Sequence, residues 1–269
     1  MISFHPLPDS SSIRDVKAAY LGSLLAPMDG MWESGITDPA PHWEIRLDGV
    51  TAGYYAANGA GTLLQFYILP AFERQARRLF DRVIAQDTID RAVVSTIDPA
   101  FLTLCLDVQK GIAVHTYLYE AGEETPLSQP AADRPLFRAA EADELERVVA
   151  FQQACLGGEA DLSGWLRGYS TTLIERGELF VLAHSADWIG LGEYRKSGTQ
   201  SGIVDLGMMV APERRGAGWA TYILALLRQR SGRSGHKPIC STTVDNVGAQ
   251  KAITRAGFIS RHRILDVTL

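Results

Sequence analysis

The 269-residue sequence has little cysteine and no long apolar run. Its three cysteines, Cys105, Cys155 and Cys240, lie far apart, so no C-x-x-C spacing offers a zinc site and no metal is expected. The first residues lack the basic and apolar segments of a secretory signal, which predicts reduced thiols in the cytoplasm. No stretch approaches the roughly 20 apolar residues of a membrane-spanning helix, so no membrane partner is expected.

The sequence also lacks a uniform charge distribution. Residues 1–128 hold 9 basic and 16 acidic side chains (9 − 16 = −7), whereas residues 195–269 hold 12 basic and 4 acidic ones (12 − 4 = +8). A basic segment in an acidic chain suggests an anionic partner, although a solvated basic face is the alternative. Because no basic patch with interleaved aromatics and no nucleic-acid motif occurs, a nucleic acid is not the expected partner.

A polar segment near the midpoint divides the chain. The stretch EAGEETPLSQPAADRP carries three prolines and no aromatic residue, which is incompatible with a helix or a central strand. Two halves of ordinary domain size lie on either side. The predicted organisation is therefore a first domain at residues 1–120, a linker at residues 121–135 and a second domain at residues 136–269.

The two halves share residue patterns at a nearly constant offset, which predicts a duplicated fold. In each half an apolar run ends at a proline, and a Glu-Arg pair and an apolar helical segment follow. The matched positions are Ser95 with Ser241, Gly111 with Gly257, His115 with His262 and Pro70 with Pro212.

Hydrophobic periodicity in the second half predicts a mixed α/β layer fold. The expected helices are residues 138–156, 162–174, 218–229 and 246–256. The expected strands are residues 179–184, 188–195, 203–210 and 239–244, with a final strand pair in residues 258–269.

The most informative segment is VAPERRGAGWA, residues 210–220. A strand ends at a proline, and Arg215-x-x-Gly218-x-Ala220 opens a helix whose first N–H groups are unpaired and lie at the positive end of its dipole. Such a loop suits a phosphate or pyrophosphate. A plain tight turn is the alternative, while a dinucleotide fingerprint is truncated and the Gly-Lys of a Walker A loop is absent.

These residues resemble the acyl-CoA pyrophosphate loop of the GNAT superfamily of N-acetyltransferases. A second segment, from Asn246 through the Gly257-Phe258 pair, resembles the second signature of that family, and together they cover about residues 136–269. The resemblance implies two GNAT-like domains of the α+β kind, each a mixed, mostly antiparallel sheet flanked by helices. In the first half the loop that begins at Pro70 has no glycine, so that half is expected to be a degenerate copy.

The resemblance further implies an N-acetyltransferase that uses acetyl-CoA as co-substrate and a small-molecule or peptide amine as acceptor. The identity of the acceptor, the acyl chain length and the oligomeric state stay open. The residues expected to bind the cofactor are Met209, Val210, Arg214, Arg215, Gly216, Ala217, Gly218, Trp219, Ala220 and Asn246.

Two carboxylates are candidates for the base that deprotonates the acceptor amine. Asp205 lies on the strand that leads into the loop, and Glu193 lies on the preceding strand. The alternatives for both are a solvated strand position or an ion pair. Trp165, with Trp32 and Trp43, is either an acceptor-site residue or a core anchor.

One position departs from the family pattern. Ile253 stands where the family often places a tyrosine that faces the cofactor sulfur, and isoleucine cannot donate a proton. Tyr194 or Tyr222 could supply it, or the thiolate leaves unaided. A non-catalytic acyl-CoA-binding sensor or interaction module is therefore the alternative function.

Overall fold

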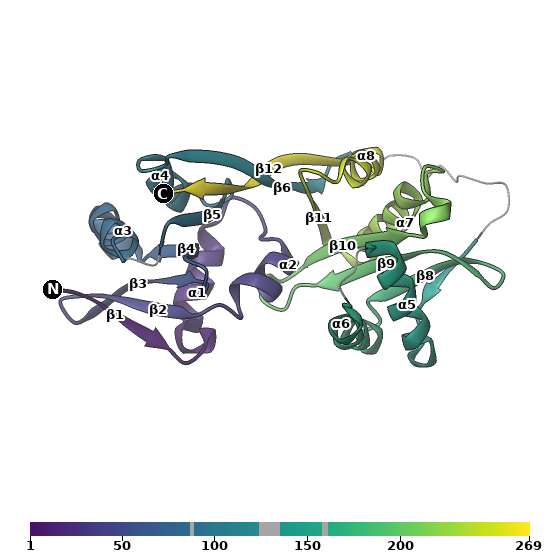
Figure 1. Ribbon diagram of the computed structural model, residues 1–269, viewed down its shortest axis with the longest axis horizontal. Coiled ribbons are helices and arrows are strands. Elements are labelled where there is room, and N and C mark those ends of the chain that lie inside the picture. The colour runs from purple at the N-terminus through teal and green to yellow at the C-terminus, as the bar shows by residue number, and fades with distance from the viewer. Residues whose placement is uncertain (87–88, 124–134, 158–160) are drawn as a thin grey trace. The chain divides into compact units, whose positions relative to one another are not determined.

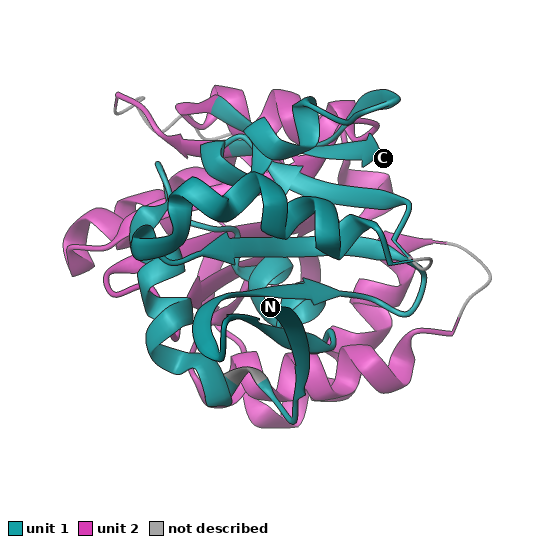
Figure 2. Ribbon diagram, turned by 90° about the vertical axis from the view of Figure 1, so that its left-hand side faces the viewer, with its two compact units in different colours: residues 1–118, 261–269 teal, residues 119–260 magenta. Residues whose placement is uncertain are grey.

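The computed structural model describes residues 1–86, 89–123, 135–157 and 161–269. The chain divides into two compact units, the first built from residues 1–118 and 261–269 and the second from residues 119–260 (Figure 2). The last nine residues thus belong to the first unit, whereas the sequence places them in the second domain. Most of the predicted linker, residues 124–134, lies outside the described residues.

The first unit contains a mixed sheet with the strand order β1-β2-β3-β4-β5-β12-β6 (Figure 1). Pairing is antiparallel from β1 to β4 and parallel between β4 and β5. The strands β6 and β12 also contribute residues to the second unit. The elements are β1 (Ile2–Leu7), η1 (Ser10–Ile13), α1 (Arg14–Ser23), α2 (Gly30–Trp32), η2 (Glu33–Thr37), β2 (His42–Leu47), β3 (Val50–Ala57), β4 (Thr62–Ile68), η3 (Pro70–Gln75), α3 (Ala76–Ile84), β5 (Arg91–Ser95), α4 (Pro99–Leu106), β6 (Gly111–Ala121) and β12 (Phe258–Thr268).

Strand β3 shows how the alternation of side chains builds a core on each face of this sheet. Tyr55 packs in a cluster with Phe80 of α3 and Phe101 of α4. The neighbouring Tyr54 points to the opposite face and packs with Tyr20 of α1. Both tyrosines are almost completely buried.

The buried carboxyl of Asp98 makes the stability of the first unit depend on pH. Its side chain caps α4 by accepting a hydrogen bond from the main-chain N–H of Phe101 (3.1 Å). Burial raises the pKa of Asp98 from 3.8 to about 6. Because the folded state holds this proton more tightly, the contribution of Asp98 to stability is fully present below pH 3.8 and is lost as the pH rises through 6. The difference between the two pKa values corresponds to about 3 kcal/mol in the free energy of unfolding.

We therefore expect Asp98→Asn, which keeps the cap without the charge, to raise the free energy of unfolding at pH 7.5 by up to about 3 kcal/mol. The variant should also lose the decline in stability between pH 4 and pH 6. Denaturant unfolding at several pH values measures both effects, with the exposed Asp15→Asn as control. A variant less stable than the wild type at pH 7.5 would contradict this prediction.

The second unit contains a sheet with the strand order β11-β10-β9-β8-β7. Pairing is antiparallel from β7 to β10 and parallel between β10 and β11. The remaining elements are β7 (Leu136–Ala139), η4 (Ala142–Glu144), α5 (Leu145–Leu156), α6 (Ser163–Glu175), β8 (Leu179–His184), β9 (Asp187–Lys196), β10 (Ile203–Val210), η5 (Pro212–Arg214), α7 (Trp219–Ser234), β11 (Lys237–Thr243) and α8 (Val247–Arg255).

Two glycines on β9 let α7 approach one face of this sheet closely. A Cβ at Gly190 would lie 2.7 Å from Ile223 Cδ1, and one at Gly192 would lie 2.9 Å from Ile223 Cγ2. The opposite face packs against α5 and α6, where Leu173 and Leu191 share a buried cluster. Helix α7, which follows the predicted loop, is thus held against β9 and β10.

The predicted α/β fold class and its duplication are confirmed. The first unit runs from β4 through η3 and α3 to β5, and the second runs in the same order from β10 through η5 and α7 to β11. Pro70 and Pro212 each open the 3₁₀ turn, where the absent N–H costs no helical hydrogen bond. In both units the two strands that flank the helix are parallel neighbours.

Two sequence-based expectations about elements were wrong. Residues 258–268 form the single strand β12 rather than part of a strand pair, because no glycine, proline or asparagine interrupts the stretch to allow a turn. Residues 136–139 form β7, paired with β8, so the helix expected at residues 138–156 begins only at Leu145.

Candidate functional site

The parallel strands β10 and β11 separate partway along their length. Their pairing register covers only Ile203–Asp205 of β10 within the described residues, although β10 continues to Val210 in register with β9. The main-chain N–H of Ala211 donates to the carbonyl oxygen of Ile189 beside β9 (3.0 Å). Because main-chain groups alternate in direction along a strand, the N–H groups of Met208 and Val210 face the side from which β11 has separated.

The loop after β10 depends on two glycines with positive φ. Gly216 has φ +80° and Gly218, the N-cap of α7, has φ +89°. Side chains with a Cβ rarely adopt this region. A Cβ at Gly216 would meet no atom within 4 Å, so the glycine opens space rather than filling a packed gap. The N–H groups of the first turn of α7 therefore border open space at the positive end of the helix dipole.

A cavity of about 680 Å³ lies within the second unit where the two strands separate and the loop begins. It brings together nine of the ten residues predicted to bind the cofactor, and the tenth, Ala217, is not among the lining residues. The predicted residues on its wall are Met209, Val210, Arg214, Arg215, Gly216, Gly218, Trp219, Ala220 and Asn246.

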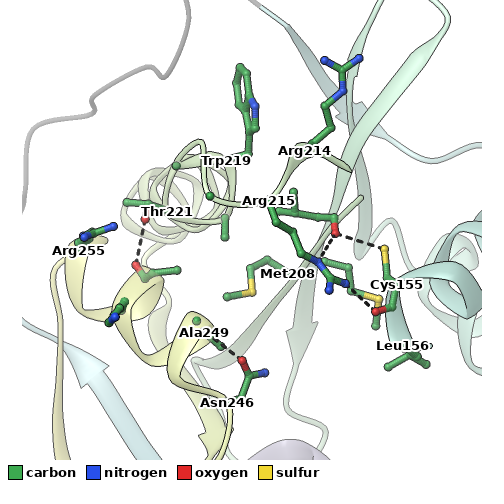
Figure 3. A pocket seen from close by; sticks show the side chains of 18 residues that line it. Cys155, Leu156, Met208, Arg214, Arg215, Trp219, Thr221, Asn246, Ala249 and Arg255 are labelled. Atoms are coloured by element: carbon green, nitrogen blue, oxygen red, sulfur yellow. Dashed lines mark hydrogen bonds between the residues drawn. The ribbon is translucent and has the colours of Figure 1, made fainter. Parts of the chain in front are cut away.

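Sequence reasoning missed half of the lining. Figure 3 shows Cys155 and Leu156, at the end of α5, on one side of the cavity, with residues of α7 and α8 on the other. No motif marks the end of α5. On α8, residues three or four positions apart lie on one face of the helix, so the residues that follow Asn246 at this spacing could have been predicted from the sequence. The missed residues are Cys155, Leu156, Met208, Thr221, Gly248, Ala249, Lys251, Ala252 and Arg255.

The two arginines of the loop have different surroundings. Arg215 donates from Nε to the carbonyl oxygen of Val210 (3.2 Å) and from Nη2 to that of Cys155 (2.7 Å). The Cys155 thiol donates to the same Val210 oxygen (3.5 Å). Arg215 thus fastens the loop to the end of β10 and to α5, whereas Arg214 extends outward with its guanidinium exposed (Figure 3).

Asn246 caps the helix on the other wall of the cavity. Its Oδ1 accepts a hydrogen bond from the main-chain N–H of Ala249 (3.1 Å), as the sequence predicted for a residue at the start of α8. The Thr221 hydroxyl of α7 donates to the carbonyl oxygen of Ala252 (3.4 Å). These contacts connect α7 and α8 at the cavity.

The two predicted carboxylates meet in one buried cluster. Arg195 donates to Glu193 Oε2 and, from Nη2, contacts Asp205 Oδ1 at 3.0 Å. The Tyr169 hydroxyl of α6 donates to Glu193 Oε2 (2.7 Å) and accepts from Arg195 Nη1 (3.1 Å). Both carboxylates are about 95% buried. Of the alternatives left open by the sequence, the ion pair is therefore present and the solvated position is not.

The carboxylates of this cluster keep the guanidinium of Arg195 charged. Burial disfavours the charge of Arg195, but the carboxylates of Asp205 and Glu193 outweigh it and raise the pKa of the guanidinium well above its usual value. Burial, and then the charge of Glu193, raise the pKa of Tyr169. Tyr169 therefore stays a neutral donor to Glu193 at physiological pH.

Register places Glu193 closer to the cavity than Asp205. Glu193 lies opposite Gly207, two residues before Met209 of the cavity wall and on the same face of the sheet. Asp205 is four residues from Met209, a distance of about 13 Å along a strand. A Cβ at Gly207 would lie 2.8 Å from Glu193 Oε2, so glycine at this position leaves room for the cluster.

The proton donors considered from the sequence are placed differently. Ile253 is buried in α8, and Tyr222 is buried in α7 with its ring edge toward Trp219. The Tyr194 hydroxyl lies 2.8 Å from His236 Nδ1, next to the start of β11 and thus at the end of the strands far from the loop. This position does not suit Tyr194 for protonating a group in the cavity.

The described residues contain neither a helix suited to crossing a membrane nor a cluster of metal-binding side chains. None of their helices is long and apolar enough to cross a membrane. They also hold no group of three or more His, Cys, Asp or Glu side chains arranged to bind a metal ion.

Comparison with known proteins identifies the family. Residues 9–122 match the family described as an acetyltransferase (GNAT) domain. A solved GNAT-family acetyltransferase from Colwellia psychrerythraea is 32% identical, with 99% of each chain covered and a TM-score of 0.92. No curated protein matches the sequence.

Two other solved structures share the fold at lower identity. A tandem GNAT protein from the clavulanic acid biosynthesis pathway is 15% identical, with 100% of this chain and 98% of that one covered and a TM-score of 0.64. A GCN5-related N-acetyltransferase from Sphaerobacter thermophilus is 16% identical, with 99% and 95% covered and the same TM-score. Since the Colwellia protein matches over nearly the full length of both chains, the protein described here belongs to the GNAT family of acetyltransferases, whose chemistry is acyl transfer.

Proposed function

We propose that the protein is an N-acetyltransferase that moves an acetyl group from acetyl-CoA to a primary amine. The observation that carries this proposal is that two structural features border one cavity. A strand with main-chain groups free of its parallel neighbour and a glycine loop at a helix N-terminus open into the same space within the second unit. The volume of about 680 Å³ is in the range of small-molecule and cofactor sites.

Binding of the cofactor is assigned to the residues predicted from the sequence. The main-chain N–H groups of the loop and of the first turn of α7, from Gly216 to Ala220, would receive the pyrophosphate. Arg214 would add positive charge, and Arg215 would hold the loop through its two carbonyl contacts. Met209 and Val210 at the end of β10, facing Asn246, would line the path of the pantetheine arm.

The proposed reaction is direct transfer. The amine nitrogen attacks the thioester carbonyl, a C–N bond forms, the C–S bond breaks and CoA leaves as the thiolate. Main-chain N–H groups on the open side of β10 would polarise the carbonyl oxygen. Glu193, or Asp205 through water, would accept the proton of the amine. Because a thiol has a pKa of about 8.5, the thiolate can leave without the acid that Ile253 cannot provide.

A degenerate first half forms part of this proposal. Pro70 is followed by AFERQARR, so the equivalent loop of the first unit carries side chains where the second has glycines. One competent site per chain is therefore expected. The match of residues 9–122 to the GNAT family agrees with an origin of that half by duplication.

A non-catalytic acyl-CoA sensor is the second candidate, and Ile253 is the observation that favours it. The test is acetyl-CoA binding by calorimetry together with thiol release over a panel of primary amines. We expect saturable binding and amine-dependent release of one thiol per acetylated amine. Binding without release for every amine would favour the sensor, and absence of binding would refute both functions.

A further inference from the structure

Three large apolar side chains are exposed where α5 ends and α6 begins. Leu156 is 49% exposed, Leu162 is 38% exposed and Trp165 is 56% exposed. Leu162 and Trp165 are three positions apart at the start of α6, so they are neighbours on the helix surface. The main-chain N–H of Leu162 donates to Gln153 Oε1 (3.3 Å), one turn before Leu156 on α5. This hydrogen bond places the start of α6 beside the last turns of α5, and we call Leu156, Leu162 and Trp165 the apolar patch.

The apolar patch is continuous with the candidate site. Leu156 itself lines the cavity beside Cys155 (Figure 3). At the other end of the patch, the indole of Trp165 stacks on the ring of Tyr169, with centroids 5.0 Å apart and planes inclined by 10°. Tyr169 in turn donates its hydroxyl hydrogen bond to Glu193. One residue of the patch therefore lies on the cavity wall, and another is one ring contact and one hydrogen bond away from the carboxylate proposed as the base.

On the α6 side of the patch the basic side chain does not oppose an approaching ammonium group, whereas the cavity wall near Leu156 carries arginines that the proposed function assigns to the cofactor phosphates and to the loop. The single basic residue of α6, Arg167, donates to both carboxylate oxygens of Glu146, with 2.7 Å for the Nη2 contact. The face of an indole ring also attracts cations. An amine with an apolar body can thus lie along the patch with its nitrogen toward the cavity.

We infer that the apolar patch binds the body of the acceptor, and that the acceptors are primary amines with an aromatic or branched aliphatic group. This inference rests on the proposed acetyl transfer. Covering exposed apolar surface is favourable roughly in proportion to its area. A polyamine or an aminoglycoside would instead lose hydrogen bonds to water against Leu156 and Trp165 without replacement. The patch thus favours arylalkylamines over strongly hydrated amines.

The test measures acetyl-CoA-dependent thiol release with 2-phenylethylamine, isoamylamine, ethanolamine, spermidine and kanamycin. We expect kcat/KM for 2-phenylethylamine to exceed that for ethanolamine at least about 30-fold, the selectivity of one or more apolar contacts. Trp165→Ser should lower kcat/KM for 2-phenylethylamine at least tenfold more than it lowers kcat/KM for ethanolamine. Trp165→Phe should retain most of the preference.

Two exposed leucines test whether the amine preference depends on the patch or on any loss of exposed apolar surface. Leu156→Ser should reduce the preference for 2-phenylethylamine, whereas Leu136→Ser on β7, 60% exposed in the same unit, should not. Circular dichroism and acetyl-CoA calorimetry check the folding of each variant. Sedimentation of wild type and Trp165→Ser shows whether the patch instead joins two copies of the chain.

The outcomes distinguish this inference from the proposed function. Thiol release that is fastest with spermidine or kanamycin, or a Trp165→Ser variant that slows all amines equally, overturns the inference and leaves the acetyltransferase intact. A dimer that Trp165→Ser dissociates without changing amine preference also overturns it. Acetyl-CoA binding without release for any amine overturns the proposed function, and the inference with it.

Discussion

Gly218→Val is expected to weaken acetyl-CoA binding at least about 100-fold, which corresponds to about 2.7 kcal/mol. Gly218 has φ +89° at the N-cap of α7, a conformation that a β-branched residue adopts only with strain of about 1–3 kcal/mol. In addition, Gly218 lines the cavity, so a valine side chain there would take up space beside the N–H groups of the helix. Calorimetric titration with acetyl-CoA measures the loss.

Gly235→Val is the matched control for this experiment. Gly235 has φ +69° at the C-cap of the same helix, and a Cβ there would meet no atom within 4 Å. Gly235 is not among the residues that line the cavity. Both variants should lose thermal stability by a similar amount, but only Gly218→Val should lose the ligand. Equal acetyl-CoA affinities for the two variants would show that the loop does not form the anion site.

Glu193→Gln is expected to lower kcat/KM by about 10²–10⁴-fold, the usual contribution of general base catalysis. The amide keeps the shape of the side chain and can still accept the hydrogen bond of Tyr169, but it cannot take the amine proton. Affinity for acetyl-CoA should stay within about threefold, because the carboxylate is not part of the cavity wall. Steady-state kinetics between pH 6 and pH 9, with calorimetry, measure both quantities.

Glu44→Gln in the first unit is the matched control for Glu193→Gln. Glu44 on β2 is also buried and also bonds the arginine two residues on, with 2.8 Å between Glu44 Oε2 and Arg46 Nε. Glu44→Gln should reduce stability without affecting kcat/KM. Asp205→Asn should have a smaller effect than Glu193→Gln if distance from Met209 decides the role. Wild-type kinetics for both Glu193→Gln and Asp205→Asn at every pH would eliminate the proposed base.

The sequence located the loop of the site because its signals are local. Pro212 ends a strand and opens a turn, and the glycines at 216 and 218 are needed for positive φ within a few residues of each other. Such backbone requirements act over a handful of residues and can be recognised without knowing the rest of the fold. For the same reason Asn246 was correctly predicted as a helix cap.

Residues that reach the site from a distance could not be found in this way. Cys155 and Leu156 belong to α5, more than 50 positions before the loop, and only the packing of α5 against the sheet brings them to the cavity. Their distance from the motif in the sequence leaves no spacing to recognise. Trp165 was recognised only as one of several tryptophans, because its exposure depends on the arrangement of α6.

By itself, the sequence determined that the chain is a duplicated α/β protein with a glycine-containing loop at residues 210–220, between a strand and a helix. Only the tertiary structure decided that Arg195 pairs with Glu193 and Asp205, and that residues 261–269 join the first unit. The physical reason is the same in both cases. A turn depends on neighbouring residues, whereas the contact of Arg195 with Asp205 depends on the register between β9 and β10, and the placement of the last strand depends on its pairing with β5 in the first half of the chain.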